Sequence, residues 1–580
     1  MNMKIVLLVF TCFLSCSSFQ TKKNSSQKLM KASLLSGHTR EQHEAFADNL
    51  MITTQGVHST QAGLKMIELG GNAFDAAAAI SFTISVERPQ STGLGGGGFM
   101  LIDGPEFEKP VAVDFREKAP QRAHSKMFLE KDGSISKNKS IDGVMASGVP
   151  GVVKGVLAVH KKYGKLSRQV VMQPAIDLAL NGFLVYPHLA KALKHRQDIL
   201  SKYPASVKIF FKNGIPLEEG DLLVQKDLAK TLEAIQKHGE KGFYDGWVAS
   251  AIAKEFQRQK GLITLDDLKN YDLKWREPIS GKFKNYDIFS MPPPSSGGTH
   301  VIQILNILEP LKLKSLGAQS VEAIHSTATA MQLAFVDRAR YMGDRDFVKV
   351  PVQGLTSKAY AKTLRLKMKD QALKLQPEDL EDAFAYESDE TTHFTVMDKL
   401  GNVVSSTQTI NYWMGSGVVI PETGIVMNDE MDDFSKKAGD TNLFGAVGSK
   451  NNLVQAGKRP LSSMSPTIIK KNGEVVLALG TPAGTRILTC VAQVALNYLE
   501  YEFSLWDSVA ATRIHHQWKP NQLRVGEPGF PKEVEAALMA KGHELNKKNL
   551  GCSIQAIAVE SGKLHGVSDP RGEGMALGNE

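Results

Sequence analysis

The chain has 580 residues, 42% of them hydrophobic and 22% charged, which is the composition of an ordinary globular protein. A formal net charge of +8 is small for this length, and no Lys/Arg-rich block is interleaved with aromatic residues, so the composition argues against a nucleic-acid-binding protein. The length suits three or four average domains, or one large sandwich.

The first sixteen residues have the pattern of an export signal. Lys4 precedes a short apolar run, Ile5–Leu14, and small residues follow, which is too short for a membrane span. Cys16 lies where a bacterial lipoprotein signal would be cut and lipidated, and ordinary signal-peptidase cleavage nearby is the alternative. We expect an exported protein, periplasmic or extracellular, with a membrane contact only through a lipid on Cys16. The polar residues 17–48 predict a flexible spacer.

Two of the four cysteines, Cys12 and Cys16, lie in this leader, which leaves Cys490 and Cys552 for the fold. Cys490 lies in an apolar stretch and is interpreted as a buried thiol. Two cysteines form neither a disulfide framework nor a metal-binding pattern. No metal site is therefore expected.

The first ordered segments predict two helices and a glycine-rich turn. Ser59 is the predicted cap of a helix that ends at Gly70-Gly71, and Asn72 with Asp75 forms a capping box for the next helix. The run Ser91–Met100 contains four consecutive glycines, but no Gly-Lys-Ser/Thr follows it, so it is not a phosphate-binding loop. The glycines instead predict a close approach of backbone to other backbone or to a ligand.

The middle of the chain is mainly helical. Arg116 follows a predicted strand at 111–115, and its guanidinium could bind a carboxylate as a fork or form a surface salt bridge. Helical periodicity dominates residues 147–350, where the segment that contains Asp337-Arg338 is interpreted as structural. Residues 358–382 predict a charged helix that leads into an acidic connector.

The last third changes to strand pairs with helices between them, which favours a layered α+β sandwich. The strongest hairpin signal is Asn472-Gly473. The predicted hairpins join 394–398 to 403–410, 467–471 to 474–479, and 553–559 to 564–567, with helices at 487–499 and after Ser504.

Thr391 stands at the start of the first of these strands, after an acidic run. A Thr-Thr pair there is usually just a β-branched pair that suits a strand. A threonine hydroxyl becomes a nucleophile when a base is adjacent, and the α-amino group of an N-terminal threonine can be that base. Since Thr391 is internal, this chemistry requires a cut between Glu390 and Thr391.

The sequence Thr391-Thr392-His393-Phe394-Thr395-Val396 resembles the self-cleavage motif of the γ-glutamyltransferases (γ-glutamyltranspeptidases, glutathione hydrolases), a family of N-terminal-nucleophile hydrolases. The likeness extends over 51–571 and includes the Leu94–Met100 and Phe115–Pro120 segments. It implies a four-layer αββα sandwich and a pair of subunits from one precursor, a large one at 49–390 and a small catalytic one at 391–580. It implies no metal and no organic cofactor.

The resemblance also implies roles for individual residues. Thr391 would be the nucleophile, and the others would support it, form an oxyanion hole through backbone N–H groups, or bind the α-amino acid head group of the substrate. Without the family, the acidic residues among them would be interpreted as turn caps or loop decoration. The supporting residue is Thr409, the oxyanion hole is Ala483 and Gly484, the α-carboxylate ligands are Arg116, Ser462 and Ser463, and the α-amino ligands are Asn411, Glu430 and Asp433.

Two positions depart from the family pattern. Ala483-Gly484 stands where the family usually has Gly-Gly, and Phe444 stands where a tyrosine closes over the substrate in many members. Phenylalanine cannot hydrogen-bond, so we expect a weaker lid that shifts the balance toward hydrolysis or admits bulkier acyl groups.

The expected function is hydrolysis or transfer of γ-glutamyl groups from glutathione and related amides to water, an amino acid or a peptide. Two alternatives stand beside it. One is a related acylase for glutaryl-cephalosporin or poly-γ-glutamate substrates. The other is an uncleaved, inactive relative that serves as a binding protein.

Overall fold

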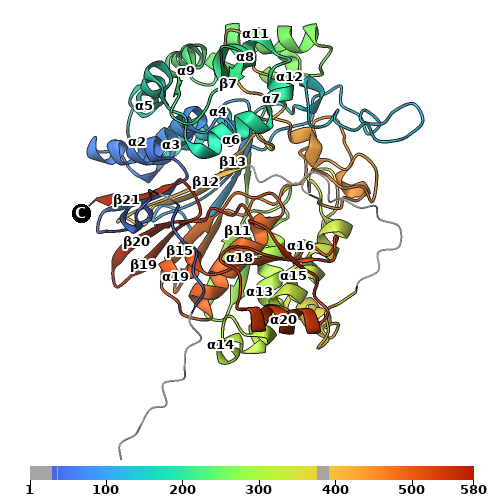
Figure 1. Cartoon of the computed structure of the whole chain (residues 1–580). Helices are drawn as coiled ribbons and strands as arrows, with labels where there is room; N and C mark the ends of the chain where they lie inside the picture. Colours follow the sequence, from blue (N-terminus) through green and yellow to red (C-terminus); the bar gives the residue numbers. More distant parts are fainter. Residues whose placement is uncertain (1–28, 36, 375–390, 444, 580) are drawn as a thin grey trace, which may run out of the picture.

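The computed structural model describes residues 29–35, 37–374, 391–443 and 445–579. These residues form a four-layer αββα sandwich in which two antiparallel seven-stranded sheets pack against each other (Figure 1). The α+β sandwich expected from the sequence is confirmed.

Each sheet contains strands from both sides of Thr391. The first sheet has the order β21 (Met575–Asn579), β2 (Leu50–Thr54), β12 (Thr392–Asp398), β13 (Val403–Thr409), β3 (Gly97–Asp103), β4 (Val111–Asp114) and β9 (Lys274–Arg276). The second has the order β1 (Glu44–Ala47), β20 (Lys563–Ser568), β19 (Gln555–Glu560), β15 (Glu474–Gly480), β14 (Thr467–Lys471), β11 (Tyr286–Ser290) and β10 (Ile279–Phe283).

Helices cover the outer face of each sheet, at the top and the bottom of Figure 1. Because both faces of the first sheet are buried, successive residues of a strand enter different cores: Leu50 and Ile52 face the upper helices, and Met51 faces the second sheet. The upper helices include α2 (Val57–Glu68), α3 (Ala73–Glu87), α4 (Val152–Tyr163), α5 (Arg168–Asn181), α9 (Lys226–His238) and α11 (Gly246–Arg258). The lower ones include α13 (Gly297–Leu308), α15 (Val321–Tyr341), α17 (Lys358–Arg365), α18 (Arg486–Leu499), α19 (Leu505–Ala510) and α20 (Lys532–Ala540).

Local sequence signals predicted much of this correctly. The three hairpins are β12–β13, β14–β15 and β19–β20. Asn472 and Gly473 both have positive φ, 54° and 88°, as the predicted two-residue turn requires. The capping box of Asn72 and Asp75 is present at the start of α3.

The glycine-rich run brings backbone against backbone, as predicted. A Cβ atom on Gly95 would lie 2.1 Å from the carbonyl oxygen of Val426, and one on Gly96 would lie 2.1 Å from that of Thr409. No side chain fits at either position, so β3 can begin directly beside the end of β13.

Two helix predictions were wrong in detail. Ser59 does not cap α2; Gly56 precedes the helix, and the buried carboxylate of Glu87 accepts hydrogen bonds from the N–H groups of His58 and Ser59. The predicted helix 358–382 ends at Arg365, because the next apolar residue, Leu366, is 81% exposed and interrupts the buried stripe. Residues 375–382 of that prediction lie outside the described residues.

The predicted spacer 17–48 is ordered in its last part. It contains α1 (Arg40–His43) and β1, an edge strand of the second sheet. Polar contacts hold this segment: the Arg40 guanidinium lies 4.6 Å from the centre of the Trp506 ring, and Glu44 lies 3.0 Å from Nε2 of His565. Such contacts leave no apolar run in the sequence, which explains why the segment looked flexible.

Cys490 was interpreted as a buried thiol; it is buried, but the thiol was wrong, because Cys490 and Cys552 form a disulfide. The two residues are 62 positions apart, and packing of α18 beside the segment before β19 brings their Cα atoms to 6.6 Å. This proximity is a tertiary feature that cysteine spacing could not reveal. Within the described part of the chain, none of the helices is long and apolar enough to cross a membrane.

Candidate active site

Thr391 lies at the point where the chain enters β12, opposite the end of β13. The antiparallel register pairs Thr392 with Gln408, which places Thr391 beside Thr409. The two hydroxyl oxygens are 3.5 Å apart, and Thr409 Oγ1 also accepts a hydrogen bond from the N–H of Asn411 at 2.8 Å. The hairpin therefore fixes the candidate nucleophile and its supporting hydroxyl.

A buried guanidinium and two carboxylates lie next to this pair. Glu430 and Asp433 occupy one 3₁₀ turn, η3 (Glu430–Asp433), in which side chains three residues apart point the same way. Arg116 donates through Nη1 to Glu430 and through Nη2 to Asp433, the latter at 2.5 Å. Arg116 is 1% exposed, so it is a fork inside the protein and not a surface salt bridge.

Burial raises the pKa values of the two carboxyl groups in this cluster, whereas their ion pairs with Arg116 lower them. Burial raises the pKa of Glu430 to about 7, although the charge of Arg116 opposes the shift. Burial likewise raises the pKa of Asp433 against the effect of Arg116. Perturbed carboxyl groups in a pocket are characteristic of functional sites.

The neighbouring Asp432 has a different task. Its carboxylate binds Lys436 Nζ at 2.7 Å and the hydroxyl of Ser140 at 2.7 Å, both inside the fold. Asp432 therefore anchors the η3 turn, and Asp433 faces the pocket.

Ser462 and Ser463 lie in the same pocket as Arg116, as the sequence predicted. Their neighbour Arg338 was missed, because its segment was interpreted as structural. Arg338 projects from α15 and donates to Ser463 Oγ at 3.1 Å and to Ser296 Oγ at 2.9 Å. Its position within a helical pattern did not indicate a role in binding. Only the tertiary fold shows that Arg338 is a second cation of the pocket.

Ala483 and Gly484 lie just before α18 and have positive φ values of 114° and 52°. Among the described residues, no acceptor takes a hydrogen bond from the N–H of either one. Two unused N–H groups beside a candidate nucleophile can stabilise a developing oxyanion. Ala483 thus adopts a backbone conformation with positive φ, which glycine would favour.

Nine of the predicted site residues line one pocket of ≈ 310 Å³, and Ala483 precedes one of them, Gly484, in the chain. Thr391 also borders a second hollow together with Lys191, Trp413 and Pro482, and Arg116 is not among the residues that line it. Phe444 and Glu390 lie outside the described residues. The pocket is lined by Arg116, Arg338, Thr391, Thr409, Asn411, Glu430, Asp433, Asn442, Ser462, Ser463, Met464, Gly484, Thr485 and Ile487.

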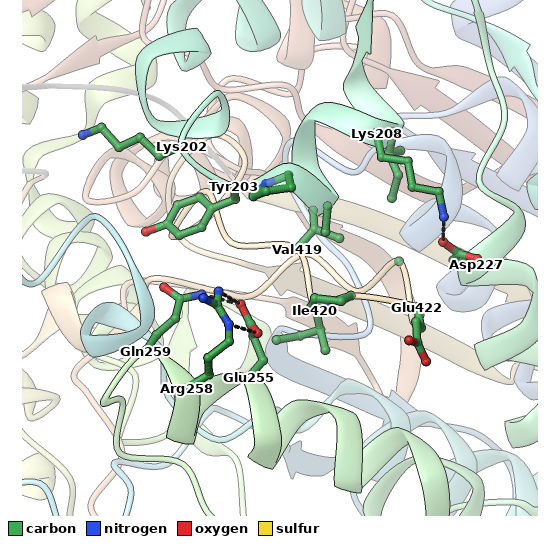
Figure 2. Close-up of a pocket in the computed structure, with 15 residues that line it drawn as sticks. Lys202, Tyr203, Lys208, Asp227, Glu255, Arg258, Gln259, Val419, Ile420 and Glu422 are labelled. Carbon is green, nitrogen blue, oxygen red and sulfur yellow. Dashed lines mark hydrogen bonds and ion pairs between the residues drawn. The ribbon is translucent and has the colours of Figure 1, made fainter.

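A larger hollow, which we call the outer hollow, lies among the upper helices and is shown in Figure 2. It is lined by Tyr203, by α11 and by the Val419–Gly424 loop, and it contains none of the predicted site residues. Four of its charged groups form ion pairs, Lys208 with Asp227 at 2.6 Å and Arg258 with Glu255 at 2.6 Å.

Comparison with known proteins agrees with this geometry. Residues 59–579 match the family model described as gamma-glutamyltranspeptidase. The chain belongs to the γ-glutamyltranspeptidase family.

Relatives and solved structures of this family extend over almost the whole chain. The chain is 45% identical to the glutathione hydrolase proenzyme of Escherichia coli strain K12, over 91% of each sequence. It is 35% identical to the acylase ACY 1 proenzyme of Pseudomonas sp. strain SE83, over 93% of this chain and 95% of that one. The structure of cephalosporin acylase from Bacillus halodurans matches with a TM-score of 0.84 and 27% identity, over 95% of this chain and all of that one.

The γ-glutamyltranspeptidase family membership makes this chain an enzyme of γ-glutamyl hydrolysis and transfer, with the N-terminal-nucleophile hydrolase fold. The first expectation from the sequence, which rested on the motif at Thr391, is therefore confirmed at the level of family, fold and reaction class.

Proposed function

We propose that this enzyme cuts its own chain between Glu390 and Thr391 and then hydrolyses glutathione and other γ-glutamyl amides. The observation that carries the proposal is the position of Thr391. Its hydroxyl lies 3.5 Å from that of Thr409, at the edge of a pocket with buried, opposite charges that suit an α-amino acid head group.

In the reaction, the α-amino group of Thr391 takes the hydroxyl proton as Oγ1 attacks the γ-carbonyl carbon. The N–H groups of Ala483 and Gly484 donate hydrogen bonds to the oxyanion of the tetrahedral intermediate. The C–N bond then breaks, the amine leaves with the proton, and an ester to Thr391 remains. Water attacks this ester in hydrolysis, and an amino acid or peptide amine attacks it in transfer.

The head group binds through charge complementarity. Glu430, Asp433 and Asn411 take the α-amino group, and Arg116 with Ser462 and Ser463 takes the α-carboxylate. Arg338 adds a second positive charge on the serine side of the pocket and holds Ser463 in place. Since the head group fills this side of Thr391, the leaving amine and the acceptor approach from the second hollow, beside Lys191 and Trp413.

The acylase alternative has support from the Bacillus halodurans structure and the Pseudomonas acylase. A glutaryl group brings a carboxylate but no α-amino group, so it would add an unbalanced negative charge to a pocket in which Arg116 already pairs with Glu430 and Asp433. We therefore favour γ-glutamyl substrates. Comparison of γ-glutamyl and glutaryl anilides measures this preference directly.

We also propose that the enzyme matures outside the cytoplasm, as a large subunit at 49–390 and a small one at 391–580. The disulfide between Cys490 and Cys552 supports an oxidising compartment. Phe444 stays a proposed lid residue, and the ratio of hydrolysis to transfer in Phe444→Tyr tests its role; an unchanged ratio would remove it.

Intact-mass analysis of the purified protein beside Thr391→Ala tests the central step. Two fragments are expected from the natural chain, the smaller beginning at Thr391, and one uncut chain from the variant. A natural chain that is never cut on incubation, and that releases no anilide, would leave the binding-protein alternative in its place.

A further inference from the structure

Glu117 lies directly behind the charged cluster and has no part in the mechanism above. Its side chain is completely buried. Within the described part of the chain, neither oxygen of its carboxyl group receives a hydrogen bond, and neither does Oε2 of Glu430. Arg116 Nη1 is 3.9 Å from Glu117 Oε2, too far for a hydrogen bond. A buried carboxylate without a donor is costly, so this group requires an explanation.

The carboxyl groups of Glu117 and Glu430 lie against the same nitrogen atom. Arg116 Nη1 donates to Glu430 Oε1 and is 3.9 Å from Glu117 Oε2. Two ionised carboxylates have only acceptors, so a hydrogen bond between the two groups requires one of them to hold a proton. Burial raises the pKa of Glu117 well above its usual range, and the charge of Glu430 raises it further, against the effect of Arg116.

We propose that Glu117 is a neutral carboxylic acid that donates a hydrogen bond to Glu430 and so positions Glu430 as an ionised acceptor for the α-ammonium group of the substrate. Glu117 is a positioning residue, since it acts through Glu430. The inference rests on the proposed function, because that function assigns Glu430 to the α-amino group.

The charge balance of the pocket supports a neutral Glu117. Arg116 and Arg338 provide two positive charges, and the ionised forms of Glu430 and Asp433 provide two negative charges. A zwitterionic head group then enters without leaving an unbalanced buried charge. An ionised Glu117 would add a third negative charge to these two positive and two negative charges.

Two buried phenols interact electrostatically with Glu117. Their hydroxyl groups donate to backbone carbonyl oxygens, Tyr244 to that of Pro150 and Tyr271 to that of Arg116. Burial raises the pKa of both phenols, which keeps them neutral around pH 7, so neither supplies a positive charge. A proton shared with Glu430 would satisfy Glu117.

The fold reserves space for this carboxyl group. A Cβ atom on Gly97 would lie 2.4 Å from Glu117 Oε2, and one on Gly148 would lie 2.9 Å from Glu117 Cβ. Gly97 belongs to the glycine-rich run, and it gives that run a second role beside the close packing of backbones.

Comparison of Glu117→Gln with Glu117→Leu tests whether Glu117 acts as a hydrogen-bond donor, because glutamine keeps a donor whereas leucine only occupies a similar volume. Glutamine still donates to Glu430, so its kcat/KM for a γ-glutamyl anilide should stay within about threefold of the natural enzyme, whereas leucine should raise KM about tenfold with little change in kcat. A glutaryl anilide, which has no α-amino group, should show no such rise in KM.

The pH dependence of kcat/KM distinguishes the proposed role from a merely structural one, because a loss of packing alone would not shift the pKa of Glu430. A lost donor raises the pKa of Glu430, so Glu430 becomes protonated at higher pH. In Glu117→Leu the acid limb of kcat/KM for the γ-glutamyl anilide should therefore shift upward, by about one pH unit for a loss of about 1.4 kcal/mol. In Glu117→Gln the acid limb should stay in place.

Glu500→Leu is the matched control, because Glu500 is a buried carboxylate at the far end of α18, paired with Lys284. It should change stability without changing the ratio of γ-glutamyl to glutaryl activity. Equal losses in Glu117→Gln and Glu117→Leu, or no loss in either, would overturn the inference. Inactivity of the natural enzyme toward γ-glutamyl anilide would instead contradict the proposed function.

An infrared measurement keeps the inference testable if the leucine variant does not fold or cut itself. The carbonyl band of a neutral carboxylic acid should be present in the natural protein at pH 7 and weaker in Glu117→Gln. Identical spectra would mean that Glu117 is ionised, and the inference would be wrong.

Discussion

The catalytic pocket and the outer hollow differ in size and, more importantly, in the surroundings of their charges. The outer hollow is about four times larger, ≈ 1230 Å³ against ≈ 310 Å³. Its cations are exposed, with 68% of Lys208 and 64% of Arg258 open to solvent. In the catalytic pocket Arg116 and Glu430 are each 1% exposed. The comparison shows that buried charges with incomplete hydrogen bonding identify the site better than its volume does.

Removal of one charge from each pocket should give the largest contrast. Asp433→Asn leaves Arg116 and the substrate ammonium short of a buried partner, and such a loss costs about 2–4 kcal/mol, or roughly 30- to 1000-fold in kcat/KM. Asp227→Asn, the same change in the outer hollow, should stay within about twofold, since exposed pairs contribute little. Steady-state kinetics with γ-glutamyl anilide measures both, and similar losses would abolish the contrast.

Removal of a cation should give an intermediate effect. Arg338→Met keeps most of the side-chain volume but frees Ser463 and removes a positive charge, so KM should rise about tenfold, in the range expected for a charged hydrogen bond. Arg258→Met in the outer hollow is the matched variant and should leave KM unchanged. A change in kcat alone for Arg338→Met would argue against a role in binding.

A backbone change should give the smallest effect. Ala483 has a φ of 114°, where alanine is strained and glycine is not. Ala483→Gly should therefore raise the free energy of unfolding by about 0.5–1 kcal/mol and increase kcat up to about threefold. Ala492→Gly, inside α18, should instead destabilise the protein by about 1 kcal/mol. Thermal unfolding with kinetics on both variants tests the difference.

Much of the fold was predictable because its signals are local. Asn472-Gly473 dictates a turn, Asn72 and Asp75 dictate a helix start, and alternating apolar residues dictate the strands. The features that were missed depend on contacts distant in sequence. The disulfide of Cys490 needs α18 to lie beside the segment before β19. Trp506 and His565, from the other end of the chain, hold α1 and β1, respectively.

The candidate site shows the same division. The family motif located Thr391, Thr409 and Asp433, and the structure brings them together. No motif could indicate that Arg338, in the last turn of α15, turns toward Ser463, or that Glu117 and Glu430 lie against the same nitrogen of Arg116. These pairs span 125 and more than 300 residues of sequence, and only packing decides them.

The presence of strands from both sides of Thr391 in each sheet has a consequence for how the enzyme can be made. The first sheet places β12 and β13 between β2 and β3, and the second places β11 and β1 at either side of strands from the C-terminal part. After the proposed cut, neither piece retains a complete sheet, so the pieces could separate only by unfolding. The precursor folds as a single chain. Once the cut enzyme is denatured, two different polypeptides would have to reassociate before it could refold. Maturation thus turns a first-order folding reaction into a second-order one, and recovery after denaturation should depend on protein concentration.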